Sequence, residues 1–366
     1  MGGNVFTGKT RRYDKDEYFA IEAEVLSILS GAFTEEALEA PRADWIQPLK
    51  AYRSKESFGD MDIVVNSAYI GPDYVRDVIQ VFNLKDDEYN KNGNVFSFVY
   101  KEFQIDLIVT KPSEFKTSLD YGHWNDCGNL VGRISHKLGL KFGHDGTTLI
   151  IKENDQVMGE IVVTRNTCDL FDLLGLDYEQ WKNGFDTLED MFEWVSSSTY
   201  FNPDIYLLDN RNNHSRARDA KRKTYHAFLE WCASRAFDDA YKYDSTVAKG
   251  GYNIREPFFS ELIVPAFPHV LIEYNEIVAK HVEHAKFKRY FNGDSFSKVT
   301  GLTGKELGAF MSWAKEQCEK KDLSRLYREH EEHTCNLTTA SLYFHYQNNF
   351  NFGEMPWEFA VNYVRN

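Results

Sequence analysis

The chain has 366 residues, of which 42% are hydrophobic and 27% are charged, so it can bury a sizeable core in two or three globular domains. Its apolar runs are far shorter than the roughly 20 residues of a membrane span, and its five cysteines form no CxxC pair, which excludes a membrane helix and a disulfide or zinc framework. The formal charge of -14 confines any nucleic-acid contact to a local basic patch.

The N-terminal region is predicted to be helical. Residues 14–33 carry apolar side chains at mostly helical spacing, and Gly31 is a stop signal. We therefore expect an N-terminal helical segment over 1–45. The first residues contain no apolar core like that of a signal peptide, so we expect a cytoplasmic protein without membrane contact.

Two dense aliphatic runs that contain acidic residues come next, at 61–65 and 103–110. Their composition favours strands over helices. Residues 72–82 predict a crossover helix between these strands, and residues 146–164 predict two further strands around a polar turn. This part of the chain is therefore expected to be an α/β half.

After about residue 202 the pattern changes to long amphipathic helices. We place a domain boundary at 201–203 and expect an all-helical C-terminal domain over 203–366. The clearest example is a helix with one apolar face formed by Leu271, Tyr274, Val278, Val282 and Ala285.

Three aspartates are the candidate catalytic residues. Asp60 and Asp62 are two apart on a predicted strand, so both side chains point to one face. Asp106 lies in an otherwise aliphatic strand, where an unpaired charge is costly. Such carboxylates repel each other unless a cation neutralises them, and three oxygen donors suit Mg²⁺ or Mn²⁺ in a two-metal phosphoryl-transfer site. The alternative is that all three are ordinary solvent-facing or edge residues.

The stretch Glu-Ser-Phe-Gly-Asp-Met-Asp at 56–62 resembles the palm motif of family X DNA polymerases, which belong to the DNA polymerase beta superfamily. The third aspartate follows at a suitable distance, and the resemblance continues over about residues 48 to 182. It implies an α+β fold with a mixed-sheet nucleotidyltransferase palm at 46–112 and a thumb-like α/β unit at 113–202. It also implies that the metals are held by Asp60, Asp62 and Asp106.

The same resemblance implies further binding residues. Arg53 matches a triphosphate-binding arginine, Asn129 a residue that contacts the incoming base, and Arg133 one that contacts the opposing strand; the alternative for each is a surface ion pair. The Gly-Ser pair that usually opens the motif is replaced by Leu49 and Lys50, and Lys50 is expected to meet phosphate as a point charge. The implied nucleotide-binding set is Lys50, Arg53, Ser57, Gly59, Tyr121, Gly122 and Asn129.

Gly122 stands where the family commonly has a bulky aromatic that crowds the sugar 2′ position. Removal of a side chain there leaves room for a ribose hydroxyl, which favours ribonucleotides. A rearranged loop is the alternative interpretation.

Residues 291–294 and 300–308 are similar to the tail of bacterial tRNA nucleotidyltransferases and poly(A) polymerases. A turn with Gly301 and Gly304 leads into a helix and exposes backbone N–H groups, and Lys305 adds charge for a nucleic-acid phosphate. A tight corner between two helices, closed by the glycines, is the alternative.

The densest basic run is 211–223. It is typical of a phosphate-contacting helix start, although such runs are also common as solvated faces. Its predicted nucleic-acid contacts are Arg216, Arg218, Lys221 and Arg222, together with Arg133 and Lys305 elsewhere.

The expected activity is transfer of a nucleoside monophosphate from a nucleoside triphosphate to a nucleic-acid 3′-hydroxyl, with release of pyrophosphate and with Mg²⁺ or Mn²⁺ as cofactor. The favoured acceptor is a tRNA or other RNA 3′ end, and DNA is the alternative. Three rival hypotheses remain: a template-directed, gap-filling DNA polymerase, a nucleotidylating enzyme acting on a protein or small molecule, and a catalytically silent nucleic-acid-binding scaffold.

Overall fold

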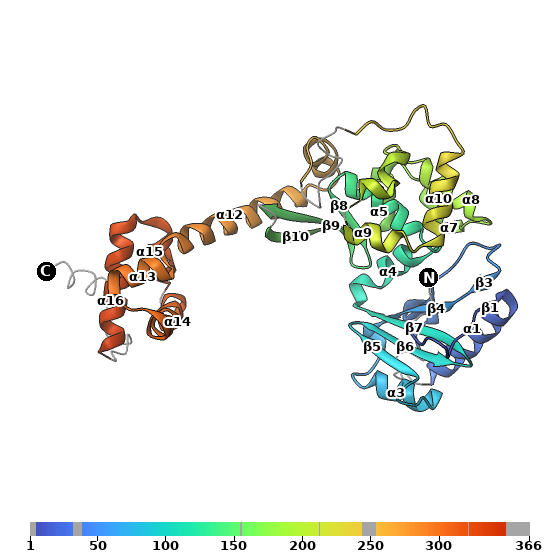
Figure 1. Cartoon of the computed structure of the whole chain (residues 1–366), viewed down its shortest axis with the longest axis horizontal. Coiled ribbons are helices and arrows are strands. Elements are labelled where there is room, and N and C mark those ends of the chain that lie inside the picture. The colour runs from blue at the N-terminus through green and yellow to red at the C-terminus, as the bar shows by residue number, and fades with distance from the viewer. Residues whose placement is uncertain are drawn as a thin grey trace. The chain divides into compact units, whose positions relative to one another are not determined.

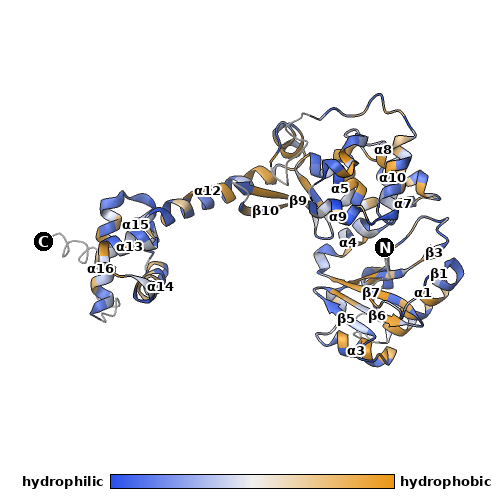
Figure 2. Ribbon diagram, in the orientation of Figure 1, coloured by the Kyte–Doolittle hydropathy of each residue, from blue (hydrophilic) through white to orange (hydrophobic). Residues whose placement is uncertain are grey.

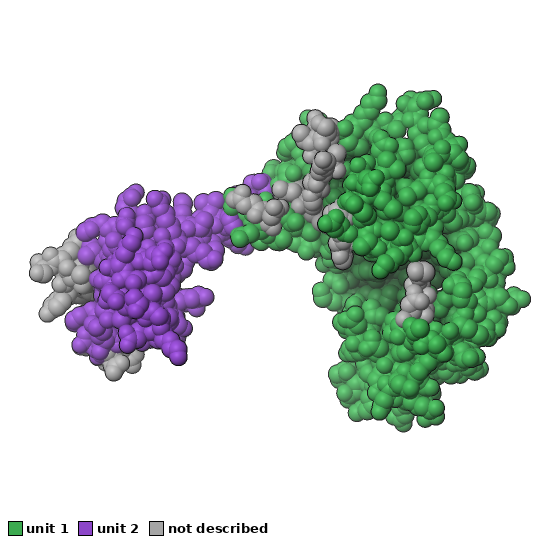
Figure 3. All heavy atoms as spheres, in the orientation of Figure 1, with its two compact units in different colours: residues 1–271 green, residues 272–366 purple. Residues whose placement is uncertain are grey.

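The computed structural model describes residues 5–31, 39–153, 156–211, 213–243, 254–320 and 322–348. The chain divides into two compact units, Met1–Leu271 and Ile272–Asn366, which are green and purple in Figure 3. Both helices and strands build the first unit, whereas the described part of the second unit is helical (Figure 1). The class is therefore mixed α+β with helices at the C-terminal end.

The first unit contains a five-stranded mixed sheet with the strand order β2-β4-β7-β6-β5. β4 and β7 are parallel, and the other neighbouring strands are antiparallel. The predicted strands at 61–65 and 103–110 are confirmed as β4 and β7. The bounds are β2 Ile46–Pro48, β4 Asp60–Asn66, β5 Tyr89–Asn92, β6 Val95–Tyr100 and β7 Phe103–Thr110.

Two helices cover one face of this sheet. α1 (Lys15–Ser30) begins at a capping box between Asp14 and Glu17 and ends before Gly31, and α3 (Tyr74–Phe82) is the predicted crossover helix. Both pack on alternate strand residues such as Ile63 in a common core. The N-terminal helix is therefore part of the sheet's core. A two-residue strand, β1 (Tyr13–Asp14), also pairs with β3 (Ser57–Phe58).

The opposite face of the sheet is covered by α4 (Phe115–Gly122). Its Phe115 and Leu119 pack on Val64 of β4 and Ile108 of β7. Side chains alternate along a strand, so the residues two positions before Val64 and Ile108 point to this same face. Those residues are acidic, and they form the site described below.

Beyond α4, a second sheet has the antiparallel order β10-β9-β8, which confirms the two strands predicted at 146–164. Figure 2 shows apolar residues concentrated in the strands of this unit. The bounds are α5 Cys127–Lys137, β8 Leu140–Gly143, β9 Gly146–Glu153, β10 Gln156–Thr164, α6 Thr167–Leu174, α7 Tyr178–Asn183 and α8 Leu188–Ser196.

The helices α9 (Asn213–Asp219) and α10 (Lys223–Ala233) belong to the first unit, although the predicted boundary near residue 202 assigned them to the C-terminal domain. The ring of Phe228 on α10 lies 5.0 Å from that of Phe192 and 4.7 Å from that of Tyr206. These buried aromatic contacts join α10 to α8 and to Tyr206 in the first unit. The division of the chain therefore falls after Leu271.

The second unit is built around the buried side chains of Phe296, Phe310, Tyr327 and Leu342. The predicted helix with an apolar face around Val278 is present as α12, in which Leu271 and Val282 are 41% and 46% exposed. The bounds are α12 His269–Tyr290, α13 Gly293–Thr300, α14 Gly304–Lys320, α15 Ser324–Glu329 and α16 Glu332–Gln347.

In the part of the chain that the structure describes, no helix on its own has the length and apolar character to cross a membrane. One bent pair, Phe259–Ala266 with His269–Thr300, passes that test by length and composition when its two pieces are taken together.

Candidate metal centre

The three predicted ligands lie together on the face of the sheet next to α4. Parallel pairing of β4 and β7 sets Asp62 directly opposite Asp106, and Asp60 is two residues before Asp62 on the same face. One carboxylate oxygen from each residue lies within 4.8 Å of those of the other two. Within the described ranges, this is the one group of three or more acidic, histidine or cysteine side chains that meets this spacing.

The electrostatics of the cluster favour a bound cation. Burial raises the pKa of Asp62 well above its usual range, and the charges of Asp60 and Asp106 raise it further. Burial also raises the pKa of Asp106. Hydrogen bonds from Ser97 and Gln104 lower this pKa, but the effect of burial is larger. A divalent ion offsets this desolvation and repulsion, which makes the deprotonated form favourable.

The donor set fits a divalent cation. Carboxylate oxygens are hard ligands of the kind that Mg²⁺, Mn²⁺ and Ca²⁺ take. With Mg–O bonds of about 2.1 Å, two oxygens on one ion lie about 3 to 4 Å apart, and the oxygens of the three aspartates lie within 4.8 Å of one another. The arrangement thus accommodates a metal ion without selecting Mg²⁺ over Mn²⁺.

Gln104 supports the cluster and was not predicted. Its Nε2 donates hydrogen bonds to both oxygens of Asp106, and its Oε1 accepts one from the backbone N–H of Val5. The signal was available in the sequence, because Gln104 is two residues before Asp106 on the same strand and must share its face. Partners of this kind orient a metal ligand.

A cavity of about 870 Å³ opens over Asp60 and Asp62. Ser57 and Gly59, two of the residues predicted to bind nucleotide, line it. The chain as a whole has a net charge of -14, but the wall of this cavity is locally basic. A basic wall suits a polyanionic ligand. The basic residues that line it are Arg11, Arg12, Lys50, Lys55, Arg222 and Lys223.

No protein-family model matches this sequence, and no curated protein matches it.

Lys55 and Arg12 are among the basic residues of this wall that were not predicted. Lys55 lies over the ring of Phe58 at 4.5 Å. Burial lowers the pKa of Lys55, while the charges of Asp60 and Asp62 raise it. The Nε of Arg12 donates a 2.8 Å hydrogen bond to Oγ of Ser57. Both cations thus flank the acidic cluster.

Lys50 also reaches the cavity, from a loop held by backbone hydrogen bonds. The N–H of Leu49 donates to the carbonyl of Asp62 at 2.8 Å, and the N–H of Trp124 donates to the carbonyl of Lys50 at 2.7 Å. The N–H of Lys50 donates to Nδ1 of His123 at 3.2 Å. With its own amide engaged in this way, Lys50 has an exposed side chain at the cavity, and its contact with a phosphate stays a prediction.

Arg53 does not line this cavity. Its Nη1 lies 2.6 Å from Oδ1 of Asp186, and its Nη2 donates to the carbonyl of Asn183. Arg53 is instead among the residues around a neighbouring cavity of about 520 Å³. The surface ion pair that the sequence left as the alternative is therefore what forms at Arg53.

Gly122 lines the cavity, but the space beside it is filled. A Cβ at Gly122 would lie 2.4 Å from Cδ1 of Leu49. The expectation of a vacancy at this position is therefore wrong, because Leu49 occupies it. Tyr121, the preceding residue, packs edge-on against Phe142 and His144.

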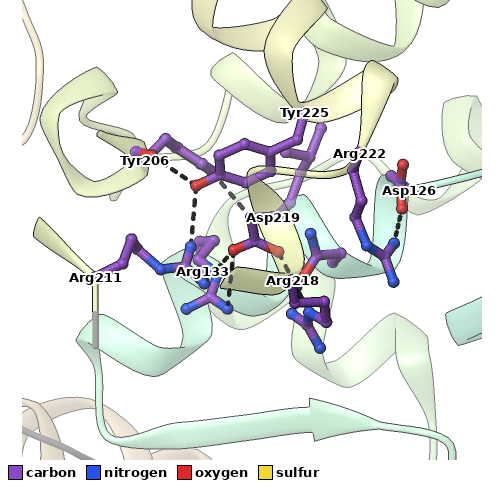
Figure 4. Close-up of polar contacts among 10 residues, drawn as sticks. Asp126, Arg133, Tyr206, Arg211, Arg218, Asp219, Arg222 and Tyr225 are labelled. Atoms are coloured by element: carbon purple, nitrogen blue, oxygen red, sulfur yellow. Dashed lines mark hydrogen bonds and ion pairs between the residues drawn. The ribbon is translucent and has the colours of Figure 1, made fainter. Parts of the chain in front are cut away.

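Asn129 and Arg133 of α5, predicted to contact the incoming base and the opposing strand, have partners inside the protein; Figure 4 labels Arg133 with Asp219. Nη2 of Arg218 donates a 2.7 Å hydrogen bond to Oδ1 of Asn129. Nη2 of Arg133 lies 3.9 Å from Oδ2 of the buried Asp219. The basic run at 211–223 thus folds against α5.

The other members of that run differ in exposure. Arg222 forms an ion pair with Asp126 at the cavity. Arg216 and Lys221 are exposed, and Nη2 of Arg216 donates to the carbonyl of Arg211 at 3.1 Å. Arg216 and Lys221 are therefore the members best able to meet an external phosphate.

Lys305 belongs to the second unit, where it is exposed in the first turn of α14. The predicted glycine turn before it is present: Gly301 and Gly304 have φ angles of +74° and +57°. These left-handed conformations favour glycine, and they allow α13 and α14 to meet in a tight corner.

Proposed function

We propose that this protein is a metal-dependent nucleotidyltransferase that transfers a nucleoside monophosphate from a nucleoside triphosphate to a nucleic-acid 3′-hydroxyl. The observation that carries the proposal is the meeting of Asp60, Asp62 and Asp106 on two adjacent parallel strands, at a cavity with basic walls. Acids without surrounding cations would repel a triphosphate. Cations without acids would hold no metal.

In the proposed reaction the acceptor's 3′-oxygen bonds to the α-phosphorus, the bond from that phosphorus to the bridging oxygen breaks, and pyrophosphate leaves. Bound divalent metal would neutralise charge on the attacking and leaving oxygens. Asp60 and Asp62 would hold this metal. Asp106, oriented by Gln104, would favour loss of the hydroxyl proton.

The basic wall has a separate task in this proposal. Lys50, Lys55 and Arg12 lie around the acids and supply the charge that a triphosphate and departing pyrophosphate require. Positioning and charge neutralisation account for most of the rate in phosphoryl transfer. The wall would therefore matter mainly for nucleotide binding and for stabilising the leaving group.

An RNA 3′ end, such as that of a tRNA, remains the proposed acceptor. Support comes from the resemblance of residues 291–294 and 300–308 to bacterial tRNA nucleotidyltransferases and from the exposed cations Arg216 and Lys221. Cytoplasmic location and Mg²⁺ as the physiological ion are part of the same proposal.

The test is a transfer assay with the full chain, each labelled NTP or dNTP, Mg²⁺ or Mn²⁺, and tRNA, single-stranded and gapped acceptors. Asp106→Asn should reduce transfer by about 10³-fold or more. The same variant should unfold at an equal or higher temperature in EDTA, because it removes repulsion. Asp73→Asn, which alters an exposed acid on the surface, is the matched control. Label that appears only on protein or on a small molecule would mean that this molecule, and not a nucleic acid, is the acceptor. Unchanged transfer by Asp106→Asn would overturn the assignment of the active site.

A further inference from the structure

A second cavity lies beside the one that contains the acids. Its volume is about 520 Å³, within the range of roughly 300 to 1,000 Å³ of small-molecule sites. Lys50 and Lys55 line both cavities, whereas Asp60 and Asp62 line only the first. A phosphate held by these two lysines is therefore within reach of both cavities.

The second cavity is rich in aromatic side chains: Tyr18, Phe19, Tyr52, Phe58 and Trp124 line it. The rings of Tyr18 and Phe58 are stacked on each other with their centroids 4.0 Å apart. The side chain of Tyr52 makes no ring contact and no hydrogen bond with any described residue. Phe19 is 52% exposed and meets Tyr18 edge-on, with the centroids 5.6 Å apart. Tyr52 and Phe19 therefore present ring surface to a planar ligand.

The same walls carry an excess of positive charge. Lys15, Lys50, Arg53 and Lys55 line the cavity, and Glu22 is the single acid among the described residues that do so. Burial raises the pKa of Glu22, which favours its neutral form. Nζ of Lys15 donates a 2.8 Å hydrogen bond to the carbonyl of Arg53, which joins α1 to the loop at 49–55. Aromatic surfaces bordered by cations are typical of sites that bind bases and their phosphates.

The indole N–H of Trp124 adds a hydrogen-bond donor. Trp124 is 5% exposed, and its Nε1 is buried without an acceptor among the described residues. A buried donor without a partner costs free energy and is uncommon in folded proteins. A nucleobase offers ring nitrogens and carbonyl oxygens as acceptors, whereas a hydrocarbon chain offers none. The unmet donor therefore favours a polar aromatic ligand over a lipid tail in this cavity.

We propose that the second cavity is a nucleobase-binding site, in which the base stacks on Tyr52 and Phe19 while Lys50 and Lys55 hold its phosphate beside the acidic cluster. This proposal rests on the proposed nucleotidyl transfer for the choice of ligand. Two substrates of that reaction carry a base: the nucleoside triphosphate and the 3′ end of the acceptor. The experiment distinguishes these two sources.

The experiment measures binding of two fluorescent probes to the full chain in Mg²⁺. One probe is the ribonucleoside triphosphate of 2-aminopurine, and the other is a single-stranded RNA with 2-aminopurine at its 3′ end. Each probe is added alone, so no transfer is needed. Stacking quenches this base, so the probe that carries the correct source should lose emission. Tyr52→Leu with Phe19→Leu should weaken binding of that probe by about tenfold. Equal binding of both probes by wild type and this leucine variant would overturn the proposal.

Two control variants separate stacking from a general disturbance of the protein. Tyr52→Phe keeps the ring, so it should bind both probes as wild type does. Phe344→Leu removes an aromatic ring that is 47% exposed in the second unit, and it should have no effect on either probe. A loss of binding in Tyr52→Phe as large as in the leucine variant would mean that the ring of Tyr52 does not act by stacking, and would overturn the proposal.

Inorganic tripolyphosphate, which has phosphates but no base, tests whether the effect belongs to the base. Its affinity, measured by calorimetry, should be the same in wild type and in the leucine variant. An equal loss of affinity for tripolyphosphate would mean that the substitutions disturb a phosphate site, and would overturn the assignment of a base to this cavity.

The transfer assay separates this proposal from the proposed function. Transfer in which the leucine variant keeps the wild-type KM for both the NTP and the RNA would overturn the base site and leave nucleotidyl transfer intact. Probe binding that depends on Tyr52 and Phe19, without transfer to any acceptor, would support the base site and overturn nucleotidyl transfer.

Discussion

Nε2 of Gln104 lies 3.1 Å from Oδ1 and 2.9 Å from Oδ2 of Asp106. The backbone N–H of Val5 donates a 3.1 Å hydrogen bond to Oε1 of Gln104. This bond fixes the orientation of the amide, so that Nε2 faces Asp106. Gln104 is only 2% exposed, so bulk water does not compete with Asp106 or Val5 for the hydrogen bonds of its amide. The carboxylate of Asp106 is therefore held in one orientation toward Asp62.

Gln104→Met should weaken divalent-ion binding by about 10- to 100-fold, because partners that orient a metal ligand typically contribute that much. Titration of Mn²⁺ or Mg²⁺ against the unfolding temperature measures this affinity. Gln80→Met, at an exposed position of α3, controls for the substitution itself. Equal affinity in wild type and Gln104→Met would remove Gln104 from the site.

Gly122→Ala should destabilise the protein by about 1 to 3 kcal/mol, since the new Cβ would overlap the side chain of Leu49. Leu49→Ala vacates that space, so Gly122→Ala should cost much less in its presence. Denaturant unfolding of wild type, both single variants and the double variant measures this coupling. Additive free energies would mean that Leu49 does not fill the space beside Gly122.

Because of His123, the free energy of unfolding should decrease as the pH becomes more acidic. Burial lowers its pKa to about 3, with further lowering by the charges of Lys50 and Lys116. The unfolded chain, with a histidine pKa of about 6.5, therefore binds more protons between the two values. The contribution of His123 is complete above about pH 6.5 and is lost as the pH falls toward about 3, at up to about 1.4 kcal/mol per pH unit.

Unfolding free energies of wild type and His123→Gln, measured from pH 7 to 4, check the effect. The variant should be less stable at pH 7, because it loses the acceptor for the N–H of Lys50, and its stability should fall less steeply. His284→Gln, at an exposed position of α12, should keep the wild-type slope. Parallel curves for wild type and His123→Gln would contradict this prediction.

Arg216→Ala with Lys221→Ala should weaken acceptor binding and reduce the slope of log affinity against log salt by about one for each lost phosphate contact. Both residues are exposed in the basic run. Fluorescence anisotropy with a labelled single-stranded RNA over a range of salt concentrations measures the slope. The control removes two exposed cations outside the cavity, by Arg76→Ala with Lys85→Ala. Equal slopes in both pairs of variants would mean that the basic run at 211–223 faces solvent and does not contact the acceptor.

Much of the site could be predicted from local pattern alone. The spacing of Asp60 and Asp62 sets them on one face of a strand, because side chains alternate along β structure. A crossover helix at 72–82 is also predicted between the two acid-bearing strands, and the structure pairs these strands in parallel, which brings Asp106 opposite Asp62. The helix before Gly31 follows from its periodicity and stop signal in the same way.

Only the tertiary structure decided what the basic side chains and the glycine do. Arg53 and Asp186 are 133 residues apart in sequence, and Arg218 and Asn129 are 89 apart. No local period encodes such pairs, because a long charged side chain bonds with whichever partner the folded chain presents. The filled space at Gly122 and the packing of the basic run at 211–223 against α5 arise in the same way, from contacts between segments distant in the sequence.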